Sequence, residues 1–425
     1  MCKLRVKGVI LLWAFLAAGV VSAQENTSLN TYTPYSMYGF GDMVQPGFTA
    51  TGAMGGITTG VRDVRQVDYV NPAGATARDS VMNFVLDFGG EMRNYYSKNA
   101  ATRTSYNTGN FRHLAAGFRI KRFGANFGIV PFSRVGYEVE QREKNDTIVA
   151  TAGDVRYKYR GEDGINQFFL NLGYNVTPSL AFGAGVKYYF GSISRYFNTE
   201  YANSSFYSIR SSDILRVSNV VPTLGAHYTL NLDKAKGRYM VFGAAFQPSM
   251  NMNVKEKVIS EVWGVNLDVV KDTTYNVKTL MPMQLNVGAS LVSIDRWMLG
   301  AEFNYQDFAK TEVLGHRDMG TSYSFKLGGY YIPNMYDVRY FYKRLTYRGG
   351  VRYSRTPFMF QGHEVNDIAV TAGVSMPMRG AGYLSFGAEV GQRGTTNYGM
   401  VQETYVTFSL SVTLFESWFR RYQYE

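Results

Sequence analysis

Between residues 82 and 415, apolar and polar residues alternate along the chain with a period of two. In residues 180–190, for example, Phe182 and Val186 fall on one face, and Lys187 falls on the other. Strict alternation of this kind predicts β-strands with two unlike faces. Several alternating stretches run for roughly 20 residues, whereas strands of soluble proteins usually have about five or six. The pattern therefore predicts an array of unusually long strands.

Turn signals divide this region into about fourteen strands, an even number of the kind that bacterial barrels prefer. Long alternating strands joined by short turns are what a membrane barrel requires, because closing the sheet leaves no unpaired edge in lipid. The sequence therefore predicts an all-β fold, a transmembrane antiparallel β-barrel. The predicted strands cover residues 82–96, 104–121, 124–141, 151–174, 179–201, 205–232, 239–262, 268–293, 296–314, 319–332, 342–361, 364–377, 382–395 and 402–415.

The composition agrees with a barrel whose apolar face meets lipid. Hydrophobic residues make up 45% of the chain and aromatic residues 15%, yet the mean hydropathy is slightly negative. A membrane barrel averages out in this way because its luminal face is polar. We expect Lys187, Glu302 and Glu389 to be solvated residues of that luminal face. Composition alone leaves a soluble β-sandwich or propeller open.

Turn-rich joints recur between alternate pairs of strands, which places them at one end of the predicted barrel. We assign this end, together with both termini, to the periplasm. The outward-facing joints, by contrast, are about five to ten residues long, and we expect them to be short loops. The turn-rich joints are residues 121–124, 175–178, 232–238, 293–296, 333–341 and 377–382.

The first 23 residues have the features of a secretory signal peptide. Basic residues precede an apolar run from Val9 to Val21, and small residues end at Ala23. The run is too short to span a bilayer comfortably, which disfavours a membrane anchor. The only cysteine, Cys2, would leave with this segment, so we expect no disulfide in the mature chain. Export and a barrel together predict the bacterial outer membrane.

Residues 24–80 lack the alternation and are rich in Gly, Thr and Ser. Their glycine content disfavours a helix, and their regularly spaced aromatic residues disfavour a linker. We predict a hatch held inside the barrel, with Pro72 fixing a corner before the first strand. A mobile periplasmic arm is the alternative. Residues 81–418 would then form the barrel, and residues 419–425 a short periplasmic tail.

Two motifs in the predicted hatch, "ATGAMGG" at residues 50–56 and "YVNPAG" at residues 69–74, precede the strands. This combination resembles the FadL family of outer-membrane transporters for long-chain fatty acids and other hydrophobic compounds. The resemblance implies a fourteen-stranded barrel, plugged by a hatch that carries an Asn-Pro-Ala triplet. Here the triplet and the next residue are Asn71, Pro72, Ala73 and Gly74.

The C-terminal half is similar to the branch of this family found in Bacteroidetes. Three stretches carry the resemblance: "YFYKRLTYRGGVRYSRTPF", "AEVGQRGTTN" and "ETYVTFSLSVTLFESWF". The chain departs from the family pattern in two respects. Its predicted outer loops are short, and it ends on "RRYQYE" rather than on a terminal aromatic residue.

Pro131 lies in the middle of the predicted third strand. Proline has no N–H for the sheet ladder, so it marks a bulge, a kink, or a site where no donor is needed. The family resemblance implies an inward kink here that opens a lateral hole facing the hatch. We therefore predict a lateral opening at Pro131, Phe132 and Ser133, with Gly128 and Gly136 relaxing the backbone on either side.

Catalytic chemistry finds little support in this sequence. The histidines are far apart and show no metal-ligand spacing, and the Gly-x-Ser-x-Gly pattern is missing. We expect no enzyme activity, no cofactor and no metal. The formal net charge of +11 comes from scattered basic residues, so we expect no nucleic-acid partner. The four histidines are His113, His227, His316 and His363.

Two functions are compatible with these features of the sequence. The first is a channel in which a hydrophobic small molecule passes the hatch and leaves sideways into the membrane. The second is a structural barrel subunit of a larger outer-membrane complex, for secretion or for barrel assembly. The partners expected are outer-membrane lipid together with a hydrophobic ligand in the first case, or other outer-membrane proteins in the second.

Overall fold

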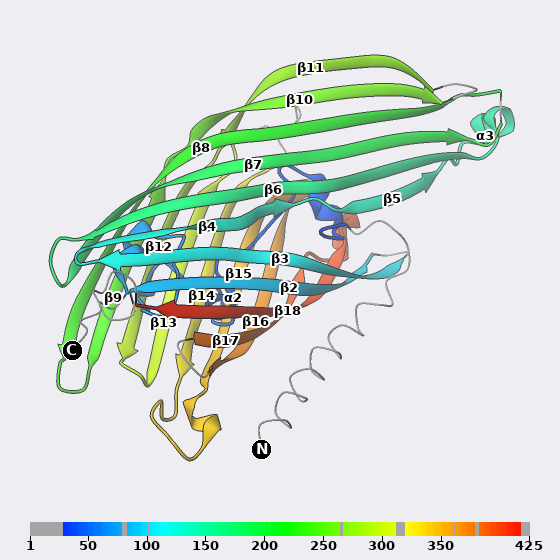
Figure 1. Ribbon diagram of the computed structural model, residues 1–425. Coiled ribbons are helices and arrows are strands. Elements are labelled where there is room, and N and C mark those ends of the chain that lie inside the picture. Colours follow the sequence, from blue (N-terminus) through cyan, green and yellow to red (C-terminus); the bar gives the residue numbers. More distant parts are fainter. Residues whose placement is uncertain are drawn as a thin grey trace, which may run out of the picture.

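The computed structural model describes residues 29–78, 83–99, 102–203, 205–263, 267–311, 319–360, 362–378 and 382–417. These residues form a closed antiparallel barrel of fourteen wall strands (Figure 1). The predicted fold class is therefore confirmed. The predicted signal peptide, the tail at residues 419–425 and His316 lie outside the described residues.

Three of the wall strands consist of two segments each. The wall contains β2 (Phe84–Lys98), β3 (Arg103–Ile120), β4 (Phe123–Arg134) with β5 (Tyr137–Arg142), β6 (Val155–Asn175), β7 (Leu180–Tyr201), β8 (Ser208–Asp233), β9 (Arg238–Gln247) with β10 (Met250–Trp263), β11 (Leu267–Met281) with β12 (Met283–Ser293), β13 (Trp297–Asp307), β14 (Thr321–Tyr331), β15 (Thr346–Phe360), β16 (His363–Pro377), β17 (Gly382–Arg393) and β18 (Gln402–Glu416). Pairing of β18 with β2 closes the barrel.

The helices of the described chain are short. They are α2 (Thr49–Gly52), α3 (Asp146–Ala152) and the 3-10 turns η1 (Pro34–Met37), η2 (Pro72–Thr76), η3 (Phe341–Arg344) and η4 (Asn397–Gly399). No helix within the described ranges is long and apolar enough to cross a bilayer.

The sequence predicted continuous strands at 239–262 and 268–293, and this was wrong. The first is divided into β9 and β10 around Pro248, and the second into β11 and β12 around Pro282. Each proline withholds an N–H from the ladder at the division. On the side of the prolines toward the short turns, β9 pairs with β12. On the other side, β10 pairs with β8 and with β11. The β10–β11 hairpin therefore leaves the closed wall and continues the sheet of β8.

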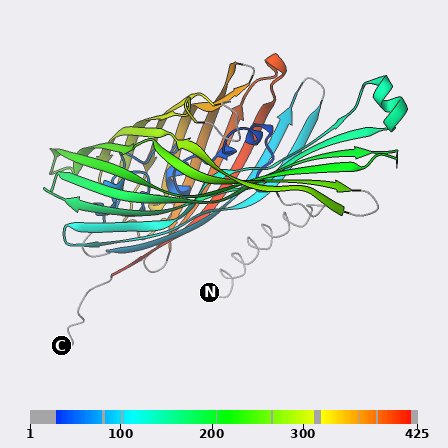
Figure 2. The ribbon, with the colours of Figure 1, turned by 90° about the horizontal axis from the view of Figure 1, so that it is seen from above.

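The strands β5 to β8, β10 and β11 project well beyond the rest of the barrel, and α3 lies at their tip (Figures 1 and 2). β8 has 26 residues, whereas a tilted strand crosses a bilayer with about 9–11. The end of the protein opposite the short turns is therefore built from extended strands on one side.

Burial along the strands follows the predicted faces. In β18, Ser409, Ser411 and Thr413 point inward and are buried, while Phe408 and Leu414 are exposed on the outside. The apolar face is therefore the lipid-facing one. Inside the wall lies the luminal segment, defined as residues 29–78, which includes η1, β1 (Asp42–Met43), α2 and η2 (Figure 2).

The face assignment predicts the effect of a charge placed in the lipid-facing band. We expect Leu410→Arg to lower the free energy of unfolding by about 2–4 kcal/mol, because the guanidinium would be transferred into hydrocarbon. Folding titrations into lipid vesicles would measure this difference. Leu410→Ala is the control that removes the side chain without adding a charge. Equal stability of the two variants would mean that this face does not meet lipid.

Candidate functional site

The Asn-Pro-Ala motif forms a capped turn in which η2 follows Asn71. The Oδ1 atom of Asn71 accepts a hydrogen bond from Ala73 N at 3.1 Å, the usual role of an N-cap residue. Its Nδ2 atom donates to the carbonyl oxygens of Thr59 at 3.2 Å and of Ala226, in β8, at 3.1 Å. Asn71 is fully buried, so this side chain joins two parts of the luminal segment to the barrel wall.

The wall receives this turn on a row of glycines, which we call the glycine seat. Its members, Gly124, Gly173, Gly183 and Gly225, stand side by side in register on β4, β6, β7 and β8. A Cβ atom on Gly183 would lie 2.3 Å from the carbonyl carbon of Pro72, and one on Gly225 would lie 2.1 Å from Oδ1 of Asn71. The turn can therefore approach the wall this closely only because these four positions lack side chains.

A second contact holds the backbone of residues 56–59. Glu302 Oε2, from β13, accepts hydrogen bonds from both Thr58 N and Thr59 N at 2.6 Å. Lys326 pairs with the same carboxylate at 3.2 Å and donates to Gly56 O at 3.1 Å. Nε2 of His227 lies 2.8 Å from Thr59 O, which accepts its hydrogen bond. Charge-assisted bonds to buried backbone are among the stronger ones in proteins.

This geometry corrects the expectation that Lys187, Glu302 and Glu389 are solvated. All three are buried, with at most 9% of each residue exposed. Glu389 pairs with Arg352 at 2.7 Å, and Glu302 holds the luminal segment. Their burial follows from the luminal segment, which occupies the space where water would otherwise meet the wall.

Further along, the luminal segment is held by an ion pair and by a hydrogen bond from a buried ion-pair network of the wall. Asp42 of β1 pairs with Arg393 of β17 at 2.7 Å. Glu91 of β2 pairs with both Arg112 and Arg134, and Arg112 also donates to the carbonyl oxygen of Gly47 at 3.2 Å. Removing one partner of such a buried pair leaves an uncompensated charge, which is costly.

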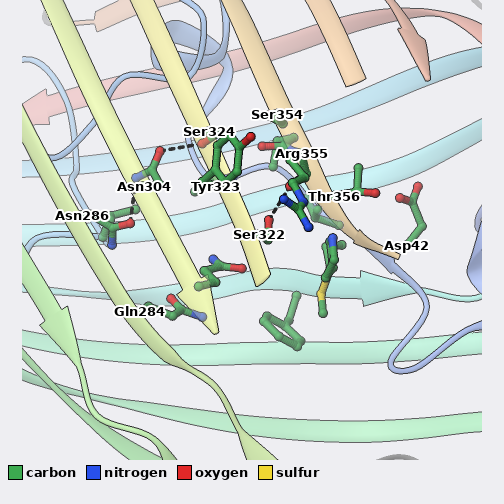
Figure 3. A pocket seen from close by; sticks show the side chains of 18 of the residues that line it. Asp42, Gln284, Asn286, Asn304, Ser322, Tyr323, Ser324, Ser354, Arg355 and Thr356 are labelled. Atoms are coloured by element: carbon green, nitrogen blue, oxygen red, sulfur yellow. Dashed lines mark hydrogen bonds between the residues drawn. The ribbon is translucent and has the colours of Figure 1, made fainter. Parts of the chain in front are cut away.

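One cavity between the luminal segment and the wall, near Pro131, has a volume of about 100 Å³ (Figure 3), and a second, of about 560 Å³, lies between residues 61–65 and wall residues such as Tyr330. Amide and hydroxyl groups dominate the labelled part of the first cavity's lining, and Asn304 lies at the centre of a chain of hydrogen bonds to Asn286, at 2.7 Å, and Ser324, at 3.0 Å. Pockets for drug-sized ligands are usually about 300–1,000 Å³ and mostly apolar. The cavity near Pro131 is smaller and more polar than a typical binding site for a drug-sized apolar ligand.

The wall changes at the predicted lateral opening. The β3–β4 ladder ends at the pair Leu114–Ile129. The β4–β6 register then shifts between Pro131 and Ser133, and β4 ends at Arg134, three residues before β5 begins. From this point outward, β3 is not paired with β4 or β5 in the described ladders. The predicted continuous strand at 124–141 is thus bulged and interrupted. Gly128 lies in the last part of the ladder, where its Cβ would meet Leu114 O at 2.4 Å.

The start of the luminal segment lies against both sides of this interruption. Thr33 N donates to Gly136 O at 3.0 Å. On the β3 side, Asn110 Nδ2 donates to Asn30 O at 2.8 Å, and the ring of Tyr32 stacks on Tyr106 with centroids 4.3 Å apart. Residues 29, 31 and 33 are buried and residues 30 and 32 are less so, as in a wall strand.

Gly136 allows this close approach, because a Cβ there would lie 1.9 Å from Thr31 O. The sequence predicted that Gly136 relaxes the backbone, but the contact of residues 29–36 with this glycine was not predicted. The alternation of Leu29, Thr31 and Thr33 was the available signal, but it is too short to be distinguished from chance.

On the side of the luminal segment toward the projecting strands, an apolar cluster fills the barrel. Phe40 of the luminal segment packs with inward-facing residues of the projecting strands, including Ile193 and Leu215, and with Phe308, just after β13, and Met319, just before β14. All five of these side chains are buried. The luminal segment is therefore covered by apolar packing on this side.

The geometry defines a class of protein, a membrane barrel with the fold of the FadL-type channels. CymD, a monoaromatic hydrocarbon channel, is 12% identical with a TM-score of 0.58, covering 87% of this chain and 97% of that chain. The toluene transporter TodX of Pseudomonas putida is 14% identical with a TM-score of 0.57, covering 89% and 100%. A FadL homologue of Pseudomonas aeruginosa is 14% identical with a TM-score of 0.56, covering 88% and 99%. At these identities the likeness concerns the fold.

A comparison with known protein families matches residues 5–425 to the BamG family, and the chain belongs to this family. No curated protein matches it. The resemblance to FadL-type barrels is thus confirmed at the level of the fold, whereas the Bacteroidetes branch stays a prediction.

The glycine seat predicts a position-specific cost for an added methyl group. We expect Gly183→Ala to lower the free energy of unfolding by about 1–3 kcal/mol and to expose the luminal segment to protease, because the new Cβ overlaps Pro72. Gly109→Ala is the matched control in a wall strand, since a Cβ there meets nothing within 4 Å. Melting curves in detergent and limited proteolysis would compare the two. Identical behaviour would mean that the turn is not seated on these glycines.

Two carboxyl groups of the luminal segment predict opposite pH dependences. Burial raises the pKa of Asp68 to about 8, above the value near 3.9 of an unfolded chain. The free energy of unfolding should therefore fall as the pH rises from about 4 to about 8, and Asp68→Asn should remove this loss. Burial alone would raise the pKa of Asp63, but the adjacent Arg65 lowers it. Asp63→Asn should therefore cost stability above about pH 4.

Melting temperatures of the intact protein at about pH 5 and about pH 8 would test this pair. The melting temperature of the Asp68→Asn variant, relative to that of the wild type, should be higher at about pH 8 than at about pH 5. The Asp63→Asn variant should melt below the wild type at both pH values. A uniform shift for Asp68→Asn at both values would contradict the assigned role of burial.

Proposed function

We propose that this protein is a structural barrel subunit of a larger outer-membrane complex, of the barrel-assembly kind, and does not conduct a substrate. The observation that carries the proposal is the closure of the lumen by the chain's own residues at successive levels. The glycine seat and Glu302 hold residues 56–76, an ion pair with Arg393 holds Asp42, a hydrogen bond from Arg112 holds Gly47, and the cluster around Phe40 covers the side toward the projecting strands.

The dense attachment supports a segment that stays in place. A gate must open at a modest free-energy cost, and elements that move are drawn from the less stable parts of a fold. Here the luminal segment is buried among charge-assisted hydrogen bonds and ion pairs on several wall strands. Membership of the BamG family supports the same proposal.

The second candidate is a channel for a hydrophobic molecule with a lateral exit at Pro131. The end of the β3–β4 ladder at Ile129 and the register shift after Pro131 favour it. The similar solved structures are described as hydrocarbon channels and toluene transporters. Such a route would require residues 29–36 to leave the interruption, and the adjoining cavity is polar and small.

Two measurements separate these candidates. Gentle extraction from the native membrane, followed by quantitative mass spectrometry, should find this protein in a fixed ratio to other outer-membrane proteins. Depletion of the chain should lower the amount of folded outer-membrane barrels. In depleted cells, expression of the Pro131→Val variant should restore both the fixed ratio and the amount of folded barrels to wild-type levels. The reason is that a scaffold does not depend on the irregular ladder at Pro131.

The control is uptake of toluene, as a representative hydrophobic molecule, by cells carrying the wild type, no protein or Pro131→Val. A scaffold predicts equal uptake in all three. Uptake that depends on the protein and slows in Pro131→Val, together with a chain that migrates alone, would overturn the proposal in favour of the channel.

A further inference from the structure

The connection between β14 and β15, residues 332–345, differs from the other turns at its end of the barrel. β3 and β4 are joined there by two residues, and β12 and β13 by three. The β14–β15 connection is several times longer and extends past the neighbouring strand ends, where it forms the gold loop at the bottom of Figure 1. We call it the projecting turn.

Internal hydrogen bonds give the projecting turn a defined shape. Asp337 Oδ1 accepts from Arg339 N at 2.9 Å and from Tyr340 N at 2.6 Å, and the Asp337 carboxylate pairs with Lys343 at 3.4 Å. Asn334 N donates to Lys343 O at 2.9 Å across the base of the turn. A turn with this many internal bonds loses little conformational entropy when it binds a partner.

The projecting turn presents apolar and aromatic side chains to the outside. Val338 is 96% exposed and Tyr336 is 75% exposed, and Phe341 and Tyr342 are also exposed. Isolated exposed apolar residues are common, but a group of them on one ordered turn is typical of an interaction site. Tyrosine in particular is enriched where proteins bind each other.

The charge of the projecting turn is positive. Within residues 332–345, the basic residues Arg339, Lys343 and Arg344 outnumber the one carboxylate, Asp337, which is already engaged by Lys343 and by two backbone N–H groups. Asp295, from the β12–β13 turn, accepts a hydrogen bond from the Tyr336 hydroxyl at 2.8 Å. Arg344 lies over the ring of Phe341 at 5.4 Å, and Arg339 over that of Tyr340 at 5.3 Å. The exposed surface therefore combines aromatic rings with guanidinium groups and has no free carboxylate within residues 332–345.

The position of the projecting turn favours a protein partner over lipid. Trp297, Tyr331 and Tyr347 stand side by side in register at the ends of β13, β14 and β15. Such a row marks the boundary between the bilayer and water in membrane barrels. Residues 336–344 follow β14 beyond this row, so they lie on its aqueous side.

We propose that the projecting turn docks into an acidic, apolar-lined surface of a second protein at the short-turn end of the barrel. Val338 and the exposed aromatic rings would enter the apolar part, and Arg339 and Arg344 would pair with carboxylates around it. The inference rests on the proposed function, because it assigns the surface by which this subunit meets a neighbour.

A photo-crosslinker tests this inference in intact cells. Benzoylphenylalanine is placed at position 338 and, as a matched control, at the exposed position of Val270 in β11, at the opposite end of the molecule. We expect one protein adduct of defined mass from position 338 and none of the same mass from position 270. The crosslinked peptide of the partner should be rich in Asp and Glu.

The charge requirement is tested by adding Arg339→Glu together with Arg344→Glu, which leaves the Asp337 bonds in place. The adduct should fall at least about tenfold, while the heat-dependent gel shift that reports a folded barrel stays unchanged. Adducts with lipid alone, no protein adduct, or an adduct that survives charge reversal would each overturn the inference. In each of these cases, persistence of the complex in native extraction would leave the proposed function standing.

Discussion

Irregular backbone buried inside a barrel must find its hydrogen-bond partners in the wall, and this requirement organises the protein. Residues 56–59 and 71–76 contact wall strands that hydrogen-bond to each other and have few free backbone groups to offer. Side chains supply the missing partners: the Glu302 carboxylate accepts from the N–H groups of Thr58 and Thr59, and Asn71 and His227 both donate to the carbonyl oxygen of Thr59. A buried polar group left without a partner would cost free energy comparable to a lost hydrogen bond.

Close packing of backbone on backbone adds a second condition, which the glycine seat meets. Where Gly183 and Gly225 lie under the Asn-Pro-Ala turn, any side chain would push the turn away from the wall and lengthen the bonds of Asn71. The hydrogen bonds and the missing side chains therefore depend on each other. Together they make the luminal segment part of the core of the barrel, which is why we favour a scaffold over a gate.

The shape of the wall follows from where its ladders end. Pro248 and Pro282 release the β10–β11 hairpin from the closed wall, and it extends the sheet of β8 outward. The interruption after Pro131 leaves β3 and β5 unpaired with each other, and residues 29–36 contact both sides. Such a barrel presents extended strands at one end and the projecting turn at the other, two surfaces that a subunit of a complex could use.

The sequence by itself determined the wall. Period-two alternation defined the strands and which face meets lipid, because lipid exposure of every second residue is a local property that each strand carries independently. The sequence also located the turns, the Asn-Pro-Ala motif and the irregular strand at Pro131. Only the tertiary structure decided what the luminal residues do. Glu302 binds Thr58 instead of being solvated, and residues 29–33 lie against Gly136. Both outcomes depend on contacts between residues far apart in the chain, and no local pattern records such contacts.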